Sequence, residues 1–89
     1  HTLVDVRSPA EFAAERIPGA LNIPLAELEA RSGSLVGAPN LVLVCASGMR
    51  AEKARALLAG KDVQACVLEG GLKEWARHSL PLEKTGGHI

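Results

Sequence analysis

The sequence is poor in several features that mark particular classes of protein. It has one Trp, one Phe and no Tyr among 89 residues, so its core must be built from aliphatic side chains. Ten basic residues balance ten acidic ones, which leaves no positive excess for nucleic acid or for an anionic membrane surface. No apolar run approaches the roughly 20 residues that span a bilayer. We therefore expect neither nucleic acid nor a membrane as a partner.

Cysteine is also scarce. The two cysteines, Cys45 and Cys66, are too few for a disulfide framework and do not form a Cys-x-x-Cys pair. Their number favours a reducing compartment, and we expect a cytoplasmic protein. His1, His78 and His88 lack metal-ligand spacing with one another or with the cysteines, so we predict no metal site and no cofactor.

Short apolar segments alternate with helical patterns along the chain. We predict strands at residues 2–6, 20–23, 41–44 and 63–68, and helices at residues 9–16, 25–31, 49–59 and 72–78. This alternation is typical of parallel βαβ units, and continuous apolar strands indicate a sheet covered on both faces. The expected fold class is therefore α/β, an open parallel sheet flanked by helices on both faces. We expect one domain over residues 1–89, with a core at 2–81 and a tail at 82–89.

One segment delivers a cysteine from a buried strand to the start of a helix. Residues 41–44 (LVLV) run into Cys45, a turn of small residues follows, and Arg50 opens the next helical pattern. A helix N-terminus has unpaired backbone N–H groups and a positive dipole, so a thiolate there is stabilised as an anion. We predict that Cys45 is a nucleophile, because a glycine-containing loop at a helix start has little purpose in a plain core.

Several other polar and bulky residues are predicted to support the fold and to take no part in the chemistry. Cys66 lies in the middle of an expected strand and is predicted to pack in the core. Asp5, Arg7 and Glu11 are predicted to brace the fold as an ion-pair network near the end of the sheet. Trp75 is predicted to anchor the core.

Three segments together resemble the rhodanese family, the persulfide-forming sulfurtransferase module. They are DVR at residues 5–7 with EF at 11–12 and IPGALNIP at 17–24, then CASGMR at 45–50, then EGG at 69–71 with Trp75 and Pro81. The segments span residues 2–81 in the family's order and spacing. The resemblance implies a rhodanese-like fold in which the family's strand and helix before the Asp-x-Arg segment are absent from this chain.

The resemblance implies a sulfurtransferase of the thiosulfate sulfurtransferase type. Cys45 would take sulfane sulfur from thiosulfate or a low-molecular-weight persulfide, carry it as a persulfide, and pass it to a thiol, cyanide or a protein acceptor. The backbone amides of the anion-binding loop would cradle that sulfur. The loop comprises Ala46, Ser47, Gly48, Met49 and Arg50. Arg50 would attract an anionic donor or hold the loop, and Ala46 replaces the Arg or Lys of many active members, which bears on substrate preference.

Two alternative functions stay open. Phosphatases and arsenate reductases of the Cys-x₅-Arg type wrap a tetrahedral oxyanion, whereas Cys45 and Arg50 have only four residues between them, which favours a single sulfur atom. The other alternative is a non-catalytic rhodanese-like binding or regulatory module, or a sulfur-relay domain of a fusion protein. The presence of Cys45 argues against the non-catalytic module.

The sequence leaves two interpretations of Met49 open: a place at the rim of the site, or ordinary packing.

Overall fold

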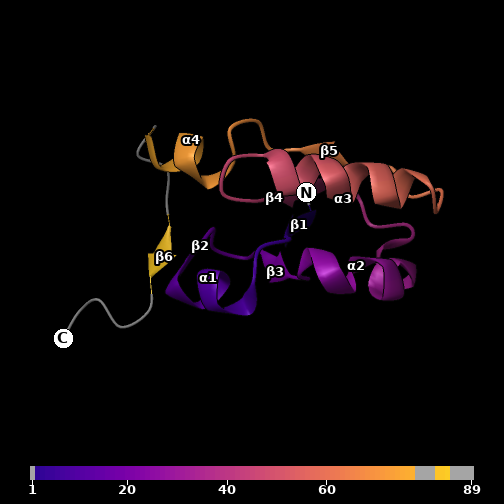
Figure 1. The fold of residues 1–89 in the computed structure, drawn as a ribbon, viewed down its shortest axis with the longest axis horizontal. Helices are drawn as coiled ribbons and strands as arrows, with labels where there is room; N and C mark the ends of the chain where they lie inside the picture. The colour runs from indigo at the N-terminus through magenta and orange to yellow at the C-terminus, as the bar shows by residue number, and fades with distance from the viewer. Residues whose placement is uncertain (1, 78–81, 85–89) are drawn as a thin grey trace.

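The computed structural model describes residues 2–77 and 82–84, in which a four-stranded parallel sheet is packed against helices (Figure 1). The strand order is β3-β1-β4-β5, with β1 at Thr2–Asp5, β3 at Leu21–Asn22, β4 at Leu41–Val44 and β5 at Cys66–Val67. Strands β1 and β4 pair along their full length, from Thr2 opposite Leu41 to Asp5 opposite Val44. The predicted α/β class is confirmed.

The helices described by the structure lie where the sequence periodicity predicts them, to within a residue or two. They are α1 (Pro9–Ala14), α2 (Leu25–Arg31), α3 (Met49–Ala59) and α4 (Gly71–Arg77), with a short 3-10 helix η1 (Ser32–Leu35) after α2. Helix α1 begins with a capping box. The Ser8 hydroxyl accepts from the Glu11 amide at 3.2 Å, and the Glu11 carboxylate accepts from the Ser8 amide at 3.1 Å. Within the described ranges, no helix is long and apolar enough to cross a membrane.

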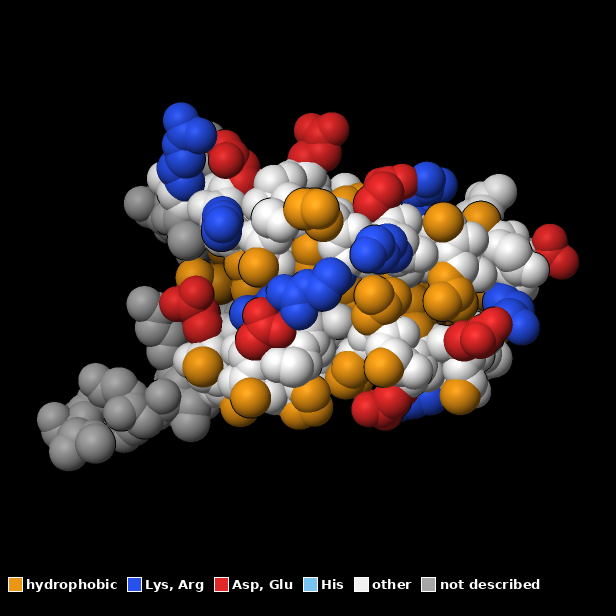
Figure 2. Space-filling model, viewed as in Figure 1, with side chains coloured by type: hydrophobic (Ala, Val, Ile, Leu, Met, Phe, Trp, Pro, Cys, Tyr) orange, Lys and Arg blue, Asp and Glu red, His pale blue; other side chains and the backbone are white. Residues whose placement is uncertain are grey.

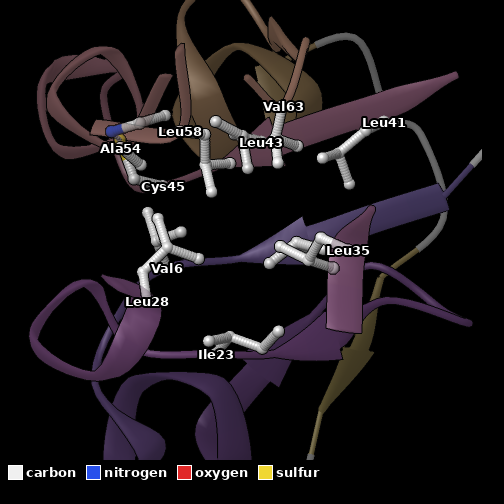
Figure 3. Close-up of a cluster of buried hydrophobic side chains, with 12 residues drawn as sticks. Val6, Ile23, Leu28, Leu35, Leu41, Leu43, Cys45, Ala54, Leu58 and Val63 are labelled. Atoms are coloured by element: carbon white, nitrogen blue, oxygen red, sulfur yellow. Dashed lines mark hydrogen bonds between the residues drawn. The ribbon is translucent and has the colours of Figure 1, made fainter. Parts of the chain in front are cut away.

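Side chains alternate between the two faces of the central strands, so the core has two parts. On one face, Leu43 and Cys45 pack with Leu28 of α2 and Leu58 of α3, all almost fully buried (Figure 3). On the opposite face, Val44 packs with residues that include Ile17, Leu72 and Trp75. Trp75 is half-buried and packs against this second cluster, as its predicted anchoring role requires. Helices therefore cover both faces of the sheet.

Several predicted boundaries differ from the structure, and the strands expected at 2–6 and 20–23 are observed at Thr2–Asp5 and Leu21–Asn22. The helix expected to reach residue 16 ends at Ala14, because the backbone turns extended at Glu15 (φ −160°, ψ 133°). Glu15–Arg16 form β2, which pairs antiparallel with β6 (Glu83–Lys84), so part of the expected tail is a strand. The strand expected at residues 63–68 shortens to Cys66–Val67, because the chain is still leaving α3 at residue 63, where its amide donates to the Leu58 carbonyl at 2.9 Å.

Candidate active site

Strand β4 carries Cys45 to the carboxyl end of the sheet. The strand is central, paired with β1 on one side and β5 on the other, and ends at Val44 immediately before the cysteine. Four residues after Cys45, helix α3 begins at Met49. Open α/β sheets bind ligands beyond the carboxyl ends of their strands, so Cys45 lies where this architecture places its sites.

The sulfur atom of Cys45 faces backbone N–H groups of the loop and of the first turn of α3. Its Sγ accepts from the Gly48 amide at 2.8 Å and from the Ala51 amide at 3.4 Å. Gly48 is the N-cap of α3 and has φ +103°, a left-handed conformation that residues with a Cβ rarely adopt. The glycine thus turns the loop back over the sulfur, and two dipoles point their positive ends at it.

The loop residues differ in exposure. Ser47 and Met49 are exposed, Met49 at 74%, whereas Ala46 and Gly48 are half-buried and Cys45 is 1% exposed. The exposure of Met49 favours the rim over ordinary packing. The cysteine is therefore buried beneath a loop whose residues Ser47 and Met49 face solvent.

Helix α4 clamps the loop from the other side. The amide of Leu72 donates to the Cys45 carbonyl at 2.9 Å, and the amide of Lys73 donates to the Ala46 carbonyl at 3.1 Å. Gly71, with φ +59°, makes this approach possible, because a Cβ there would lie 2.2 Å from the Cys45 carbonyl oxygen. Sequence reasoning included this glycine in a family segment but gave it no role at the site.

Arg50 is paired with Glu11 of α1. Its Nη1 donates to Oε1 at 2.8 Å and its Nη2 to Oε2 at 3.0 Å, a bidentate arrangement. The hydrogen bonds from Arg50, with a smaller contribution from the Ser8 backbone, lower the pKa of Glu11 from 4.5 to about 2. The same hydrogen bonds raise the pKa of Arg50, against partial burial. The pair ties α1 to the first turn of α3.

The predicted network of Asp5, Arg7 and Glu11 is divided into two pairs. Asp5 and Arg7 form a buried ion pair, with Arg7 Nη2 at 2.8 Å from Asp5 Oδ2 and the Arg7 amide at 2.9 Å from Oδ1. Asn22 closes the group by donating to the carbonyls of Asp5 and Arg7, both at 3.0 Å. Glu11 is bonded to Arg50 instead, so the prediction that it joins the other two is wrong.

Cys66 is exposed, which contradicts its predicted place in the core. Its neighbours Ala65 and Val67 pack against the cluster beneath α3, so alternation along the strand turns Cys66 to the opposite face. Cys66 lines an open hollow of about 680 Å³ together with residues that include Asn40 and Arg55. This hollow lies at the amino ends of β4 and β5 and is separate from Cys45.

The described residues include no group of three or more His, Cys, Asp or Glu side chains that could hold a metal ion. The three histidines lie outside the described residues. Figure 2 shows acidic and basic side chains interspersed over the face in view, in keeping with the balanced charge of the sequence.

Comparison with known proteins identifies the family. The model of the rhodanese-like domain matches residues 1–78. The chain belongs to the rhodanese-like family. A sulfurtransferase from Allochromatium vinosum is 38% identical to this rhodanese-like domain over 86 residues, which cover 96% of this chain and 80% of the relative.

Two further relatives bear on the architecture. A rhodanese-related protein from Thermoplasma volcanium has a crystal structure that matches this rhodanese-like domain with a TM-score of 0.86 at 29% identity, over 92% of this chain and 82% of that one. An HTH-type transcriptional regulator from Mycobacterium tuberculosis is 40% identical over 87 residues. The match covers 93% of this chain and only 38% of the regulator, so a similar domain occurs as part of a longer protein.

Proposed function

We propose that this domain is a sulfurtransferase of the thiosulfate sulfurtransferase type, in which Cys45 carries sulfane sulfur as a persulfide. The observation that carries the proposal is the Cys45 sulfur at the carboxyl end of β4, facing the amides of Gly48 and Ala51. Named sulfurtransferases among the relatives support the same class of reaction. Cys45 is the proposed catalytic residue, and the loop from Ala46 to Arg50 the proposed anion-binding segment.

In the first half-reaction, the Cys45 thiolate attacks the outer sulfur of thiosulfate. A new S–S bond forms on Cys45, the S–S bond within thiosulfate breaks, and sulfite leaves with the bonding electron pair. The product is the anion Cys45–S–S⁻. The inward N–H groups and the N-terminus of α3 stabilise negative charge both on the attacking thiolate and on the carried sulfur.

In the second half-reaction, a thiolate, cyanide or a cysteine of an acceptor protein attacks the outer sulfur of the persulfide. The S–S bond to Cys45 breaks, and its electron pair restores the thiolate. Oxidation states balance without a metal or an added reductant. A reducing compartment such as the cytoplasm suits this cycle, and both cysteines are free in the structure.

The phosphatase alternative is less compatible with the site. A Cys-Arg phosphatase needs its arginine to grip the oxyanion, whereas both terminal nitrogens of Arg50 are bonded to Glu11. A second candidate function is a regulatory or sulfur-relay module of a longer protein. The similarity to part of a transcriptional regulator favours this candidate.

The test is the intact mass of the reduced protein after incubation with thiosulfate. We expect wild type and Cys66→Ser to gain the mass of one sulfur atom and Cys45→Ser to gain none. Because Cys66 is exposed, its serine variant is the matched control for unspecific thiol chemistry. No gain on Cys45, with thiosulfate or with glutathione persulfide as donor, contradicts catalysis and favours the regulatory module.

A further inference from the structure

The Arg50–Glu11 pair places a cation and an anion beside the active-site loop. Arg50 is the last residue of the loop, and Glu11 approaches it from α1 in a fork-to-fork geometry. Their side chains are 38% and 39% exposed, so both face solvent from which a donor must arrive. An ion pair that shares two parallel hydrogen bonds holds both groups in a fixed orientation.

Arg50 also interacts electrostatically with Cys45, the proposed nucleophile. The hydrogen bonds that Arg50 donates to Glu11 are the main cause that raises the pKa of Arg50; partial burial opposes them, and attraction to Glu11, Cys45 and Asp5 raises it further. Attraction between two charges is mutual, so the guanidinium also attracts an anion held at Cys45. Glu11 offsets that attraction, because the low pKa of its own carboxyl keeps it ionised throughout the neutral range.

The other side of the loop adds no net charge. Glu69 and Lys73, both exposed, lie before and after Gly70-Gly71 and carry opposite charges. Glu74, whose side chain lies against Gly70, is paired with Arg77 at 3.5 Å. Ala46, within the loop, carries no charge. The electrostatic potential near Cys45 therefore depends mainly on whether the charge of Arg50 is neutralised by Glu11.

We propose that Glu11 is a positioning residue that sets donor specificity: it neutralises Arg50 and so disfavours a dianionic sulfur donor relative to a monoanionic one. This inference rests on the proposed function, because it concerns the donor that reaches Cys45. In this proposal, Glu11 contacts neither the donor nor Cys45 and acts through the guanidinium of Arg50.

Two small donors with the same reacting group isolate this effect. Thiosulfate carries two negative charges and methanethiosulfonate carries one. In each, the Cys45 thiolate attacks the terminal sulfur, the S–S bond breaks, and sulfite or methanesulfinate leaves with the electron pair. Both reactions give the same Cys45 persulfide, so the ratio of their kcat/KM values measures the preference for the extra charge.

The experiment measures this ratio in wild type and four variants, with cyanide as acceptor at low ionic strength. Glu11→Gln keeps the capping box, since Gln serves at that position, but removes the charge. We expect it to raise the thiosulfate preference roughly three- to tenfold, with a steeper loss on added salt. Arg50→Gln leaves Glu11 unopposed and lowers the ratio, and the double variant returns close to wild type.

Glu29→Gln is the matched control. It changes the net charge of the domain by the same amount, but Glu29 lies on α2 and pairs with Lys61, which follows the C-terminal end of α3, at 3.6 Å on the exposed surface. We expect its ratio to stay within about twofold of wild type.

The outcomes separate this inference from the proposed function. If wild type transfers sulfur through Cys45 but all Glu11 and Arg50 variants lose activity equally toward both donors, Glu11 is a structural strut and the inference is overturned. If wild type forms no persulfide on Cys45, the proposed function fails and the inference falls with it. A ratio that rises equally in Glu11→Gln and Glu29→Gln reflects total charge alone and also overturns it.

Discussion

The Glu11 carboxylate accepts hydrogen bonds from two residues, and each bond favours the ionised form of Glu11. Arg50 donates two hydrogen bonds to the carboxylate and the Ser8 backbone donates a third, which together lower the pKa of Glu11 from 4.5 to about 2. A carboxylate whose pKa is lower in the folded state contributes stability that is complete above its ordinary pKa. That contribution is lost as the pH falls from the ordinary value to the folded one.

Acid unfolding should therefore depend on Glu11. Between about pH 5 and pH 2, we expect wild type to lose about 1 kcal/mol more of its free energy of unfolding than Glu11→Gln does, the half-exposed pair being partly screened by water. Urea unfolding across this pH range measures the difference. Glu27→Gln, which removes a carboxylate 3.8 Å from Arg31 on α2, is the control and should follow wild type. Parallel curves for wild type and Glu11→Gln would contradict the expectation.

At the scale of elements, the loop after Cys45 is held by two helices that follow it in the chain. Helix α3 supplies the amide of Ala51 to the sulfur, and α4 supplies the amides of Leu72 and Lys73 to the loop carbonyls. The approach of α4 depends on the missing side chain of Gly71. The loop geometry is therefore a property of packing between elements and is not contained in residues 45–50 alone.

Replacing Gly71 tests this dependence. In Gly71→Ala, the new Cβ would lie 2.2 Å from the Cys45 oxygen and 2.7 Å from the Ala46 carbonyl carbon, so α4 must shift. We expect a loss of about 2 kcal/mol in the free energy of unfolding and a fall of about tenfold or more in the rate of persulfide formation. Gly33→Ala is the control, because a Cβ there meets nothing within 4 Å. Equal rates for the two variants would show that α4 does not set the loop.

Local signals explain which elements the sequence could predict. Helix α3 is bounded by glycines at residues 48 and 60, and the four apolar residues of β4 have no competing pattern. Residues 13–16 (AAER) read as helix, yet the pairing of β2 with the distant β6 makes Glu15 and Arg16 extended. Propensity is a weak prior that tertiary pairing overrides.

The features of the candidate site also divide into those that local sequence predicts and those that depend on distant contacts. Cys45 and its loop are recognisable because strand, small-residue turn and helix start follow one another directly in the sequence. The pairing of Arg50 with Glu11 and the contact of Gly71 with Cys45 join segments far apart in the chain, and no local pattern encodes them. For Cys66, local pattern predicts the strand, but the face that its side chain occupies depends on the pairing of that strand in the sheet.

At the scale of the whole molecule, stability rests on two aliphatic clusters separated by the sheet. The larger cluster joins the sheet to α2 and α3, and Leu43 lies within it on the central strand, fully buried (Figure 3). A domain of this size has a total stability of only about 5–15 kcal/mol. One large cavity would therefore remove a substantial fraction of it.

Leu43→Ala should lower the free energy of unfolding by about 2–5 kcal/mol, through lost burial and an unfilled cavity. Chemical denaturation monitored by circular dichroism measures the change. Val36→Ala is the control, since Val36 is 70% exposed, and its effect should stay within about 0.5 kcal/mol. Similar losses in both variants would contradict a core centred on β4.

The contact between α4 and the loop also orders events during synthesis. Cys45 leaves the ribosome well before Gly71, Leu72 and Lys73, whose backbone completes the hydrogen bonding of the Cys45 and Ala46 carbonyls. A nascent chain that ends before these residues exposes a thiol without its finished enclosure. The surroundings of the Cys45 thiol are therefore complete only when the later part of the domain has been synthesised and α4 has docked on the loop.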